Sequence, residues 1–386
     1  MMKKTIVALA ATAVTGAFAQ VAITGNIDLG ITSVNGQTLA SNTSGLAPNN
    51  TSTSTLAFSG SEDLGGGLKA GFKLETTLTA NTASSLDASP ATGSTGFTNF
   101  HSGTPFNSEQ FLSLSGGFGT VRFGVPNAAV FRAQGASQPF GTGFGSGYSS
   151  TFSRMGYTQG YAISDYLGTA NGAGTTLRVT RMQNTLQYES NVMNGFWVMA
   201  EYAAQNDNAT SPTAFGGNTP EFMGLLVNYN AGNMNVAAAY NTVKVGAQRI
   251  ASGYTLTTGL LTSSLTSGAN IAYSFLGGNY KMGANTFYAG MTYVKASDAS
   301  EDTSSWNVAY KYALNPNVDL LANMVNVTNN LASTSNLNRS LRAAGADYRF
   351  SKRTNAYARY EVIDTNTDNA TTGETIRTSI GIRHQF

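Results

Sequence analysis

The chain has 386 residues, of which only 11% are charged, and it contains no cysteine. Soluble domains carry about 25% charged residues, so the composition argues against an ordinary soluble domain, and the lack of cysteine excludes disulfides and thiolate metal sites. The formal charge of +2 comes from 22 basic and 20 acidic residues, and it falls to zero if Lys3 and Lys4 are cleaved off, which argues against a general polyanion-binding surface.

The first predicted element is an export signal. Two lysines precede an apolar run at 6–13, and the segment 17–19 (AFA) has the small-x-small pattern of a cleavage site. The run is shorter than the ~20 residues that a membrane-spanning helix needs. We therefore expect residues 1–19 to be a cleaved signal peptide and residues 20–386 to form one exported domain.

The rest of the chain is built of segments in which apolar and polar residues alternate. The first begins at Val21 and places Asp28 opposite its aliphatic residues, which predicts a strand with one side toward water. A hairpin then pairs 55–61 with 68–78 around a glycine-rich turn at 62–67. Further short turns, rich in Gly, Asn, Pro or Ser, are predicted at 116–119, 191–195, 230–232, 281–283, 313–317 and 351–354.

Long polar segments lie between these hairpins, at 35–54, 79–108, 126–176, 206–220, 244–267, 296–302, 328–340 and 364–374. Short turns that alternate with long loops are typical of a bacterial outer-membrane barrel. Such strands face lipid only at every second residue, which explains a mean hydropathy of −0.12. We therefore predict an all-β fold, a transmembrane antiparallel β-barrel of about 16 strands, which is wide enough to enclose a water-filled channel.

The charged residues follow this two-sided pattern. The last strand, 375–386, puts Ile380 and the terminal Phe386 on one face and Arg377 and Arg383 on the other. Because a Lys or Arg on the lipid face at mid-bilayer costs about 2–4 kcal/mol, we expect the uncharged face to contact lipid. The outward positions are also uncharged in the strands that begin near Met234, Phe287, Trp306 and Ala356.

Several motifs resemble those of the Gram-negative trimeric general porins. They stand at 60–70 (GSEDLGGGLKA), 114–124 (LSGGFGTVRFG), 184–190 (NTLQYES), 348–357 (YRFSKRTNAY) and 381–386 (GIRHQF). The resemblance covers essentially the whole chain after residue 19. It implies a homotrimer in the outer membrane of a Gram-negative bacterium, surrounded by lipid, whose third long loop, 126–176, folds into the barrel as a constriction. It also implies a trimer contact through the outward faces of the first and last strands, with the loop 79–108 latching onto a neighbouring subunit.

Charged side chains on the inward faces are the candidate pore residues. We expect the pore or its constriction to be lined by Lys73, Glu109, Arg122, Arg154, Asp165, Arg181, Arg359, Glu361, Arg377 and Arg383. Asp165, on the third long loop, would then face cations of the wall and set up a transverse field. Two alternatives remain open. These charges could serve only to be solvated, and the loop could cover the outer mouth instead of entering the barrel.

The sequence departs from the general porins at positions that bear on selectivity. Glu109 stands in or beside a stretch where the family commonly has an arginine, and Thr55 and Val125 occupy places where family members often carry basic residues. These departures put the strong anion preference that the resemblance implies in question, and with a mature chain of zero net charge we predict a weak anion preference, or almost no selectivity.

The sequence offers no catalytic or cofactor site. His101 and His384 lack a Ser or Asp partner at a catalytic spacing, and the basic residues are too dispersed for binding nucleic acid. We expect a non-enzymatic channel, without cofactor or metal, for passive diffusion of ions and small hydrophilic solutes. The alternatives are a substrate-selective channel, a barrel used as an adhesin or structural surface protein, and, more remotely, a barrel-embedded hydrolase.

Overall fold

The computed structural model describes residues 21–36, 43–78, 106–143, 180–204, 221–244, 270–297, 302–330, 337–367 and 370–386. The expected signal peptide, residues 1–19, lies outside the described residues and stays a prediction. Within the described ranges, no helix has the length and hydropathy needed to cross a membrane.

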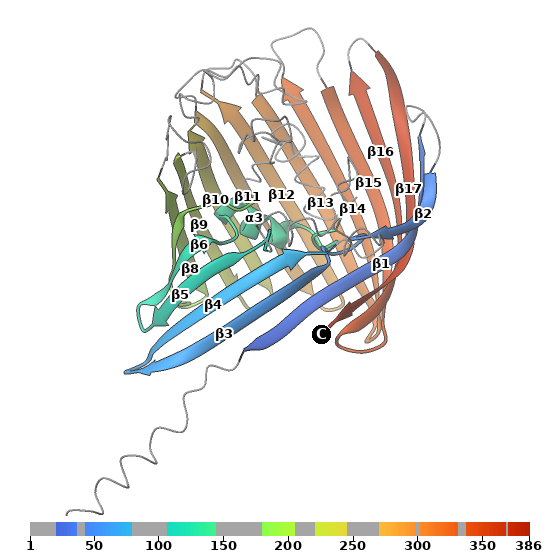
Figure 1. The fold of residues 1–386 in the computed structure, drawn as a ribbon. Helices are drawn as coiled ribbons and strands as arrows, with labels where there is room; N and C mark the ends of the chain where they lie inside the picture. The colour runs from blue at the N-terminus through green and yellow to red at the C-terminus, as the bar shows by residue number, and fades with distance from the viewer. Residues whose placement is uncertain are drawn as a thin grey trace, which may run out of the picture.

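Strands make up most of the described chain (Figure 1). They are β1 (Ala22–Gly36), β2 (Thr43–Pro48), β3 (Thr55–Gly65), β4 (Leu68–Thr77), β5 (Gln110–Gly116), β6 (Gly119–Val125), β7 (Thr185–Glu189), β8 (Phe196–Ala203), β9 (Glu221–Ala231), β10 (Met234–Lys244), β11 (Asn270–Met282), β12 (Asn285–Ala296), β13 (Asp302–Asn315), β14 (Val318–Asn330), β15 (Leu337–Arg349), β16 (Thr354–Thr367) and β17 (Ala370–Gln385). A short helix, α3 (Ala129–Gln134), and a 3-10 turn, η2 (Gly135–Ser137), follow β6.

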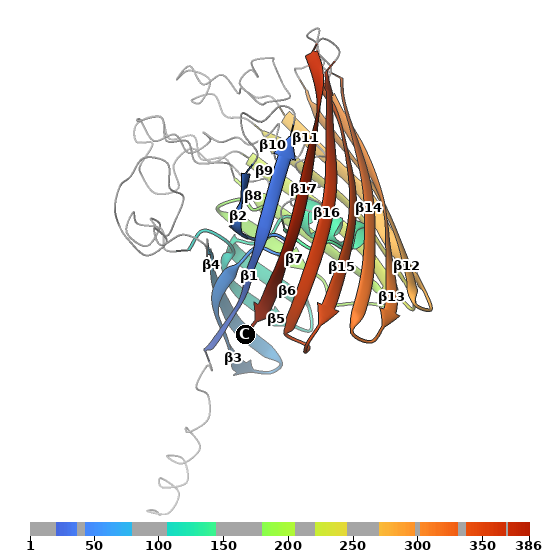
Figure 2. The same ribbon diagram turned by 90° about the vertical axis from the view of Figure 1, so that its right-hand side faces the viewer.

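The strands form one closed antiparallel sheet. Each strand from β3 onward pairs with the next, and β17 pairs with β1, beside which it lies in Figure 2. Residues 22–26 of β1 pair with β3, whereas residues 29–34 pair with β2. Because β2 and β3 share one place beside β1, the 17 strands occupy 16 positions around the ring. The predicted 16-stranded barrel is confirmed.

The prediction of a continuous loop over residues 35–54 is wrong for the middle of this range. Residues 43–48 form β2, which continues the pairing of β1 beyond the point where β3 begins. The reason is physical: without β2, the main-chain N–H and C=O groups of this part of β1 would lack partners on one side, and lipid cannot replace them. The residues that follow β2 turn into the barrel.

The glycine-rich turn between β3 and β4 is tighter than predicted. Gly66 and Gly67 alone lie between the two strands, and both have left-handed φ angles, of 61° and 82°. Glycine adopts this conformation without the clash that a Cβ atom would cause. The connection is therefore a two-residue hairpin turn.

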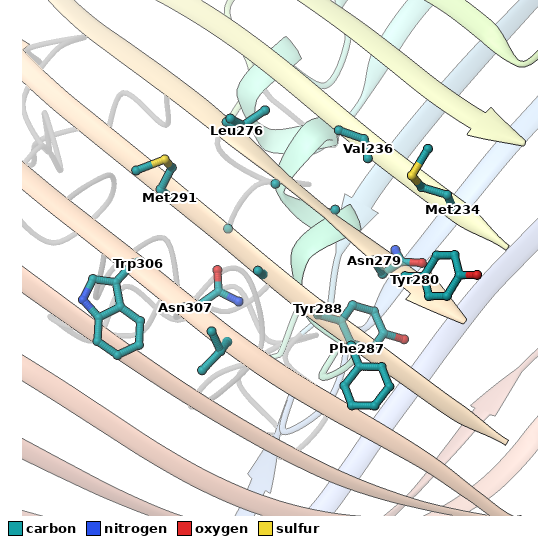
Figure 3. Close-up of a pocket in the computed structure, with 15 residues that line it drawn as sticks. Met234, Val236, Leu276, Asn279, Tyr280, Phe287, Tyr288, Met291, Trp306 and Asn307 are labelled. Atoms are coloured by element: carbon teal, nitrogen blue, oxygen red, sulfur yellow. The ribbon is translucent and has the colours of Figure 1, made fainter. Parts of the chain in front are cut away.

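The two faces of the sheet differ in polarity as predicted. Met291 and Trp306 point outward and are 57% and 43% exposed, whereas their neighbours Thr292, Ser305 and Asn307 point inward and are buried. The outward side chains of β10–β13 line an apolar hollow in the outer wall, where Figure 3 shows Met234, Val236, Leu276, Phe287, Met291 and Trp306. Large apolar side chains in such numbers are suited to lipid contact rather than to water.

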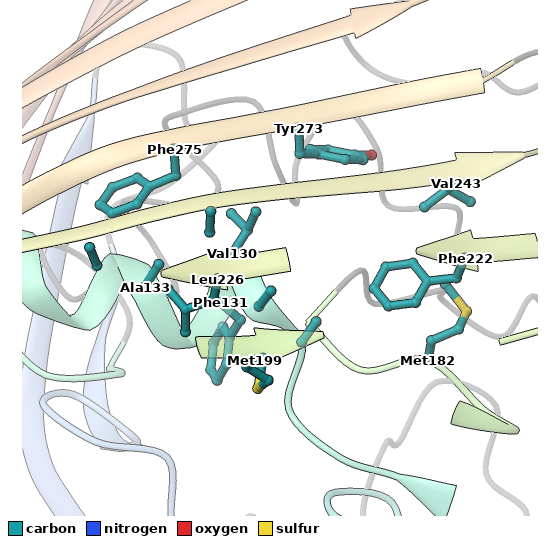
Figure 4. Packing of buried hydrophobic residues seen from close by; sticks show 14 of the residues in the cluster. Val130, Phe131, Ala133, Met182, Met199, Phe222, Leu226, Val243, Tyr273 and Phe275 are labelled. Carbon is teal, nitrogen blue, oxygen red and sulfur yellow. The ribbon is translucent and has the colours of Figure 1, made fainter. Parts of the chain in front are cut away.

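The described part of the third long loop lies inside the barrel. Figure 4 shows α3 against the inner face of the wall, where Val130 and Phe131 are buried with Met199 of β8 and Leu226 of β9. A second cluster joins Phe140, just after η2, to apolar residues of β14, β15 and β16. The expected inward course is confirmed for this part of the loop, and the remainder, from residue 144 onward, lies outside the described residues.

Candidate functional site

A buried carboxylate of the wall holds the start of α3. Glu201 on β8 is 5% exposed, and its Oε1 accepts hydrogen bonds from the Ala129 N–H at 2.7 Å and from Asn241 Nδ2 at 2.9 Å. Its Oε2 accepts another from Gln187 Nε2 at 2.9 Å. Asn241 in turn accepts a hydrogen bond from the Val130 N–H at 2.8 Å. The first N–H groups of a helix have no partners within the helix, so the wall supplies them.

Gly224 on β9 leaves the space in which this contact forms. It lies on the strand between β8 and β10, and a Cβ atom added to it would overlap Glu201 Oε1 and Asn241 Nδ2. Any larger residue at this position would therefore separate the two side chains that hold α3.

Amide side chains of the wall bind the next turn of the loop. Asn279 Nδ2 on β11 donates to the Ala136 carbonyl at 2.8 Å, and Asn307 Nδ2 on β13 donates to the Ser137 carbonyl at 2.7 Å. Gly290 on β12 lets η2 approach the wall, because a Cβ atom there would lie 2.7 Å from Ser137 Cβ. The loop therefore follows the wall from β8 to β13 instead of crossing the lumen.

Beyond η2 the loop covers Arg359 on β16. The Phe140 ring, 2% exposed, has its centroid 5.4 Å from the guanidinium carbon of Arg359. Arg359 Nη2 also donates to both carboxylate oxygens of Asp347, at 2.9 and 3.1 Å. This predicted site residue thus lies on the lumen side of the wall, but beneath the loop and paired with a carboxylate.

A cluster of charged side chains lies where the third long loop begins, directly after β6. Lys73 Nζ lies 2.8 Å from Glu75 Oε2 and 2.7 Å from Glu109 Oε2. Glu109 Oε1 also accepts a hydrogen bond from the Asn127 N–H at 3.0 Å, and Ser108 Oγ donates to Glu75. Arg181, which bonds Asn127, also acts on Glu75, so two basic groups face the two carboxylates and the cluster is close to neutral.

A second cluster joins β6, β7 and α3. Arg122 Nη1 donates to Glu189 Oε2 at 2.9 Å and to Gln187 Oε1 at 3.0 Å, and Arg132 also donates to Glu189. The guanidinium of Arg132 lies over the Trp197 ring, 4.9 Å from its centroid. Two guanidinium groups share one carboxylate here, so this cluster carries an excess of one positive charge.

Arg181 lies beside the first charged cluster, and the other remaining predicted residues lie on β16 and β17. Arg181 Nε donates to Asn127 Oδ1 at 2.7 Å. Arg377 Nη1 lies 3.6 Å from Glu361 Oε2, and Arg383 donates to an asparagine of β16 at 2.9 Å. These contacts place basic groups on the inner face of β17 as well as near β6.

Some of the ten predicted site residues meet one another. They form the ion pairs Lys73–Glu109 and Arg377–Glu361. Arg154 and Asp165 lie outside the described residues, so the transverse field stays a prediction, as does the pore-lining role of the other eight. Within the described ranges, no group of three or more acidic or histidine side chains could hold a metal ion.

Sequence reasoning missed two carboxylates, Glu189 and Glu201. Simple alternation places Glu201 on the inward face of β8 together with Met199 and Ala203, both of which are apolar and buried. An acidic residue on an apolar inward face is the signal that could have singled it out, because a buried carboxylate needs hydrogen-bond donors. One of its donors is the main-chain N–H of Ala129 at the start of α3, and a main-chain contact of this kind cannot be recognised from residue types.

Comparison with known sequences gives two matches. A model of the Gram-negative porins matches residues 5–368. Outer membrane porin protein 32 of Delftia acidovorans is 38% identical to the chain over 126 residues, which are 32% of this chain and 31% of that relative. The alignment thus spans about a third of the relative's length.

Solved structures of similar fold cover nearly the whole chain. The anion-selective porin from Comamonas acidovorans has a TM-score of 0.70 at 21% identity, over 96% of this chain and 100% of that one. The trimer form of in-vitro folded OmpT from Vibrio cholerae has a TM-score of 0.60 at 17% identity, over 95% and 99% of the two chains. OmpF of Salmonella typhi, in a complex with daunomycin, has a TM-score of 0.60 at 15% identity, over 95% and 98%.

Replacing Glu201 with Ala should release α3 from the wall. The change leaves the Ala129 N–H, Gln187 Nε2 and Asn241 Nδ2 without their acceptor, and each buried donor left unpaired costs about 1–3 kcal/mol. We expect a lower urea midpoint for unfolding and faster hydrogen exchange of the α3 main-chain amides, which the native wall contact protects.

Glu201→Gln is the matched control, because its side-chain carbonyl can still accept from Ala129, and we expect its α3 amides to exchange more slowly than those of Glu201→Ala. Equal amide exchange in α3 of Glu201→Ala and of the unmodified protein would contradict the role assigned to this carboxylate.

Proposed function

Because the chain belongs to the Gram-negative porin family, we propose that it forms a water-filled channel for passive diffusion of ions and small hydrophilic solutes. The protein is an outer-membrane protein, and its family consists of channel proteins rather than enzymes. The observation that carries the proposal is the course of the loop, which follows the inner wall through Glu201, Asn279 and Asn307. A loop bound along the wall narrows a pore without filling it.

We infer a homotrimer as the assembly. OmpT from Vibrio cholerae, which has a related fold, has been solved in a trimer form, the assembly that the resemblance to the general porins also implies. Side chains on the outward faces of β1 and β17 support a contact there, because Ile23, Ile31, Ile380 and Ile382 are all more than half exposed. Exposed aliphatic residues on the first and last strands suit a subunit contact as well as they suit lipid.

We also infer that the channel discriminates weakly between anions and cations. Where the loop leaves β6, Glu75, Glu109 and Glu189 offset all but one of the positive charges of Lys73, Arg122, Arg132 and Arg181. A wall whose charges are paired produces a small net potential in the lumen, so neither sign of ion is strongly favoured. The Comamonas acidovorans porin is described as anion-selective. We therefore expect that any ion selectivity of this channel favours anions weakly.

Single-channel recording of the purified protein in a planar bilayer tests the channel itself. We expect ohmic steps whose size follows the conductivity of the bulk electrolyte, since ions would cross a lumen filled with water. Block by one class of solute that saturates with concentration would favour a substrate-selective channel instead. A protein that inserts but conducts no ions would contradict the proposal and favour a surface-adhesion role.

The zero-current potential across a salt gradient tests the balance of charges. Glu109→Gln removes a negative charge and should shift the potential toward anion selectivity, whereas Lys73→Gln removes a positive charge and should shift it the other way. The two variants control for each other, because they disturb the same ion pair with opposite signs. Pronounced cation preference of the unmodified channel would contradict weak selectivity.

A further inference from the structure

A second stretch of chain, besides the third long loop, turns into the barrel. The residues between β2 and β3, Asn49–Ser54, form what we call the inner segment. Asn49, Asn50 and Thr51 are 7%, 4% and 4% exposed, and Ser54 is fully buried. Loops of a barrel ordinarily run over its surface, so this depth of burial requires specific partners within the wall.

The partner is the carboxylate of Asp28 on β1, which is fully buried. Its Oδ2 accepts three hydrogen bonds, from the Thr51 N–H at 2.7 Å, Thr51 Oγ1 at 2.6 Å and the Ser52 N–H at 2.7 Å. Its Oδ1 accepts a fourth from the Tyr357 hydroxyl at 2.6 Å. Among the described residues, no Lys, Arg or His forms an ion pair with Asp28, and the groups that donate to its carboxylate are neutral.

Tyr357 reaches Asp28 across the seam where the barrel closes. It lies on β16, and its side chain passes over β17 to β1 at the point where Gly381 pairs with Gly30. A Cβ atom at Gly381 would overlap the Tyr357 hydroxyl, and one at Gly30 would lie 2.8 Å from it. The two glycines therefore leave the space for a tyrosine that fixes Asp28 from the opposite side.

The inner segment also positions a predicted pore cation. Asn50 Oδ1 accepts hydrogen bonds from Arg377 Nη2 at 2.6 Å and from Thr32 Oγ1 at 2.8 Å. Asn50 Nδ2 donates to the Tyr357 hydroxyl at 3.1 Å. Through these bonds the inner segment and Arg377 are held in one hydrogen-bonded network with Asp28.

The end of the described loop rests on the inner segment. The Gly143 N–H donates to the Thr51 carbonyl at 3.1 Å, and the Thr53 N–H donates to Thr142 Oγ1, also at 3.1 Å. A Cβ atom at Gly143 would overlap the Asn50 carbonyl, so the two backbones are in close contact. The loop that starts on β6 therefore ends its described course on a support held by Asp28.

We propose that the inner segment is a second constriction element of the channel, and that Asp28 is the positioning residue for it and for the end of the loop. The proposal rests on the channel function proposed above. Asp28 holds the inner segment away from the outer mouth, and the inner segment supports residues 142–143 of the loop. Loss of the carboxylate frees Thr51 and Ser52, and both stretches then move out of the narrowest part of the lumen.

The test measures which neutral polymers enter the reconstituted channel, because their entry reports pore width independently of charge. Asp28→Ala should raise the single-channel conductance and admit larger polyethylene glycols than the unmodified channel does. Tyr357→Phe, which keeps the carboxylate, should give a smaller change of the same direction, and it provides the readout should Asp28→Ala fail to fold. Asp319→Ala is the matched control, since it removes a buried wall carboxylate that hydrogen-bonds Arg349.

An engineered disulfide distinguishes two causes of a wider pore, displacement of the inner segment and a general loosening of the barrel. The chain has no cysteine, so Asn26→Cys with Ser52→Cys introduces a single possible bridge between β1 and the inner segment, where Asn26 Nδ2 and Ser52 Oγ lie 2.8 Å apart. In the Asp28→Ala background, the oxidised bridge should restore the native polymer limit, and a reductant should abolish the restoration.

An unchanged polymer limit in both Asp28→Ala and Tyr357→Phe would overturn the inference while leaving the channel function intact. A widened pore that the bridge does not restore would overturn it as well, because the widening would then arise elsewhere. An unmodified protein that conducts no ions would overturn the proposed function and this inference together.

Discussion

The main-chain pairing of β1 with β17 is the interaction on which the rest of the structure depends. A sheet with free edges could not stand in lipid, because its unpaired N–H and C=O groups would find no partners there. The seam runs from Gly36 to Asn26 along β1, and Gly25 and Phe386 extend it by exchanging N–H···O bonds of 3.1 Å. Once the ring is closed, every strand has a lipid side and a lumen side, and the lumen becomes a space into which loops can fold.

What folds into that space is held by polar groups of the wall as well as by apolar packing. Glu201, Asn279 and Asn307 bind the main chain of the third long loop, and Asp28 binds the main chain of the inner segment. These are side-chain contacts to backbone groups that water would otherwise solvate, so each fixes a position along the chain more than it adds stability. The strands therefore carry side chains that hydrogen-bond the main chain of these loops at specific levels along the barrel axis, and these bonds position the constriction.

The strands and their two faces were predictable because apolar and polar residues alternate along the sequence, as at Ile382 and Arg383 or at Met291 and Thr292. The long-range contacts were not. Alternation correctly turned Asp28 inward, yet we expected it to face water, and it lies beneath the inner segment and against Tyr357. Nothing local in the sequence marks a bond between residues so far apart, and β2, with Leu46 as its one large apolar residue, carries no clear strand pattern.

The central claim is that the strands separate lipid from water at every second residue, and spin labels placed along β12 test it most directly. Since the chain has no cysteine, residues 286–294 can each be replaced singly by cysteine and labelled. We predict that accessibility to oxygen dissolved in the membrane peaks at Phe287, Ala289, Met291 and Tyr293 and falls at the positions between them. A period near 3.6 residues, or equal accessibility along the whole stretch, would contradict the barrel and every conclusion drawn from it.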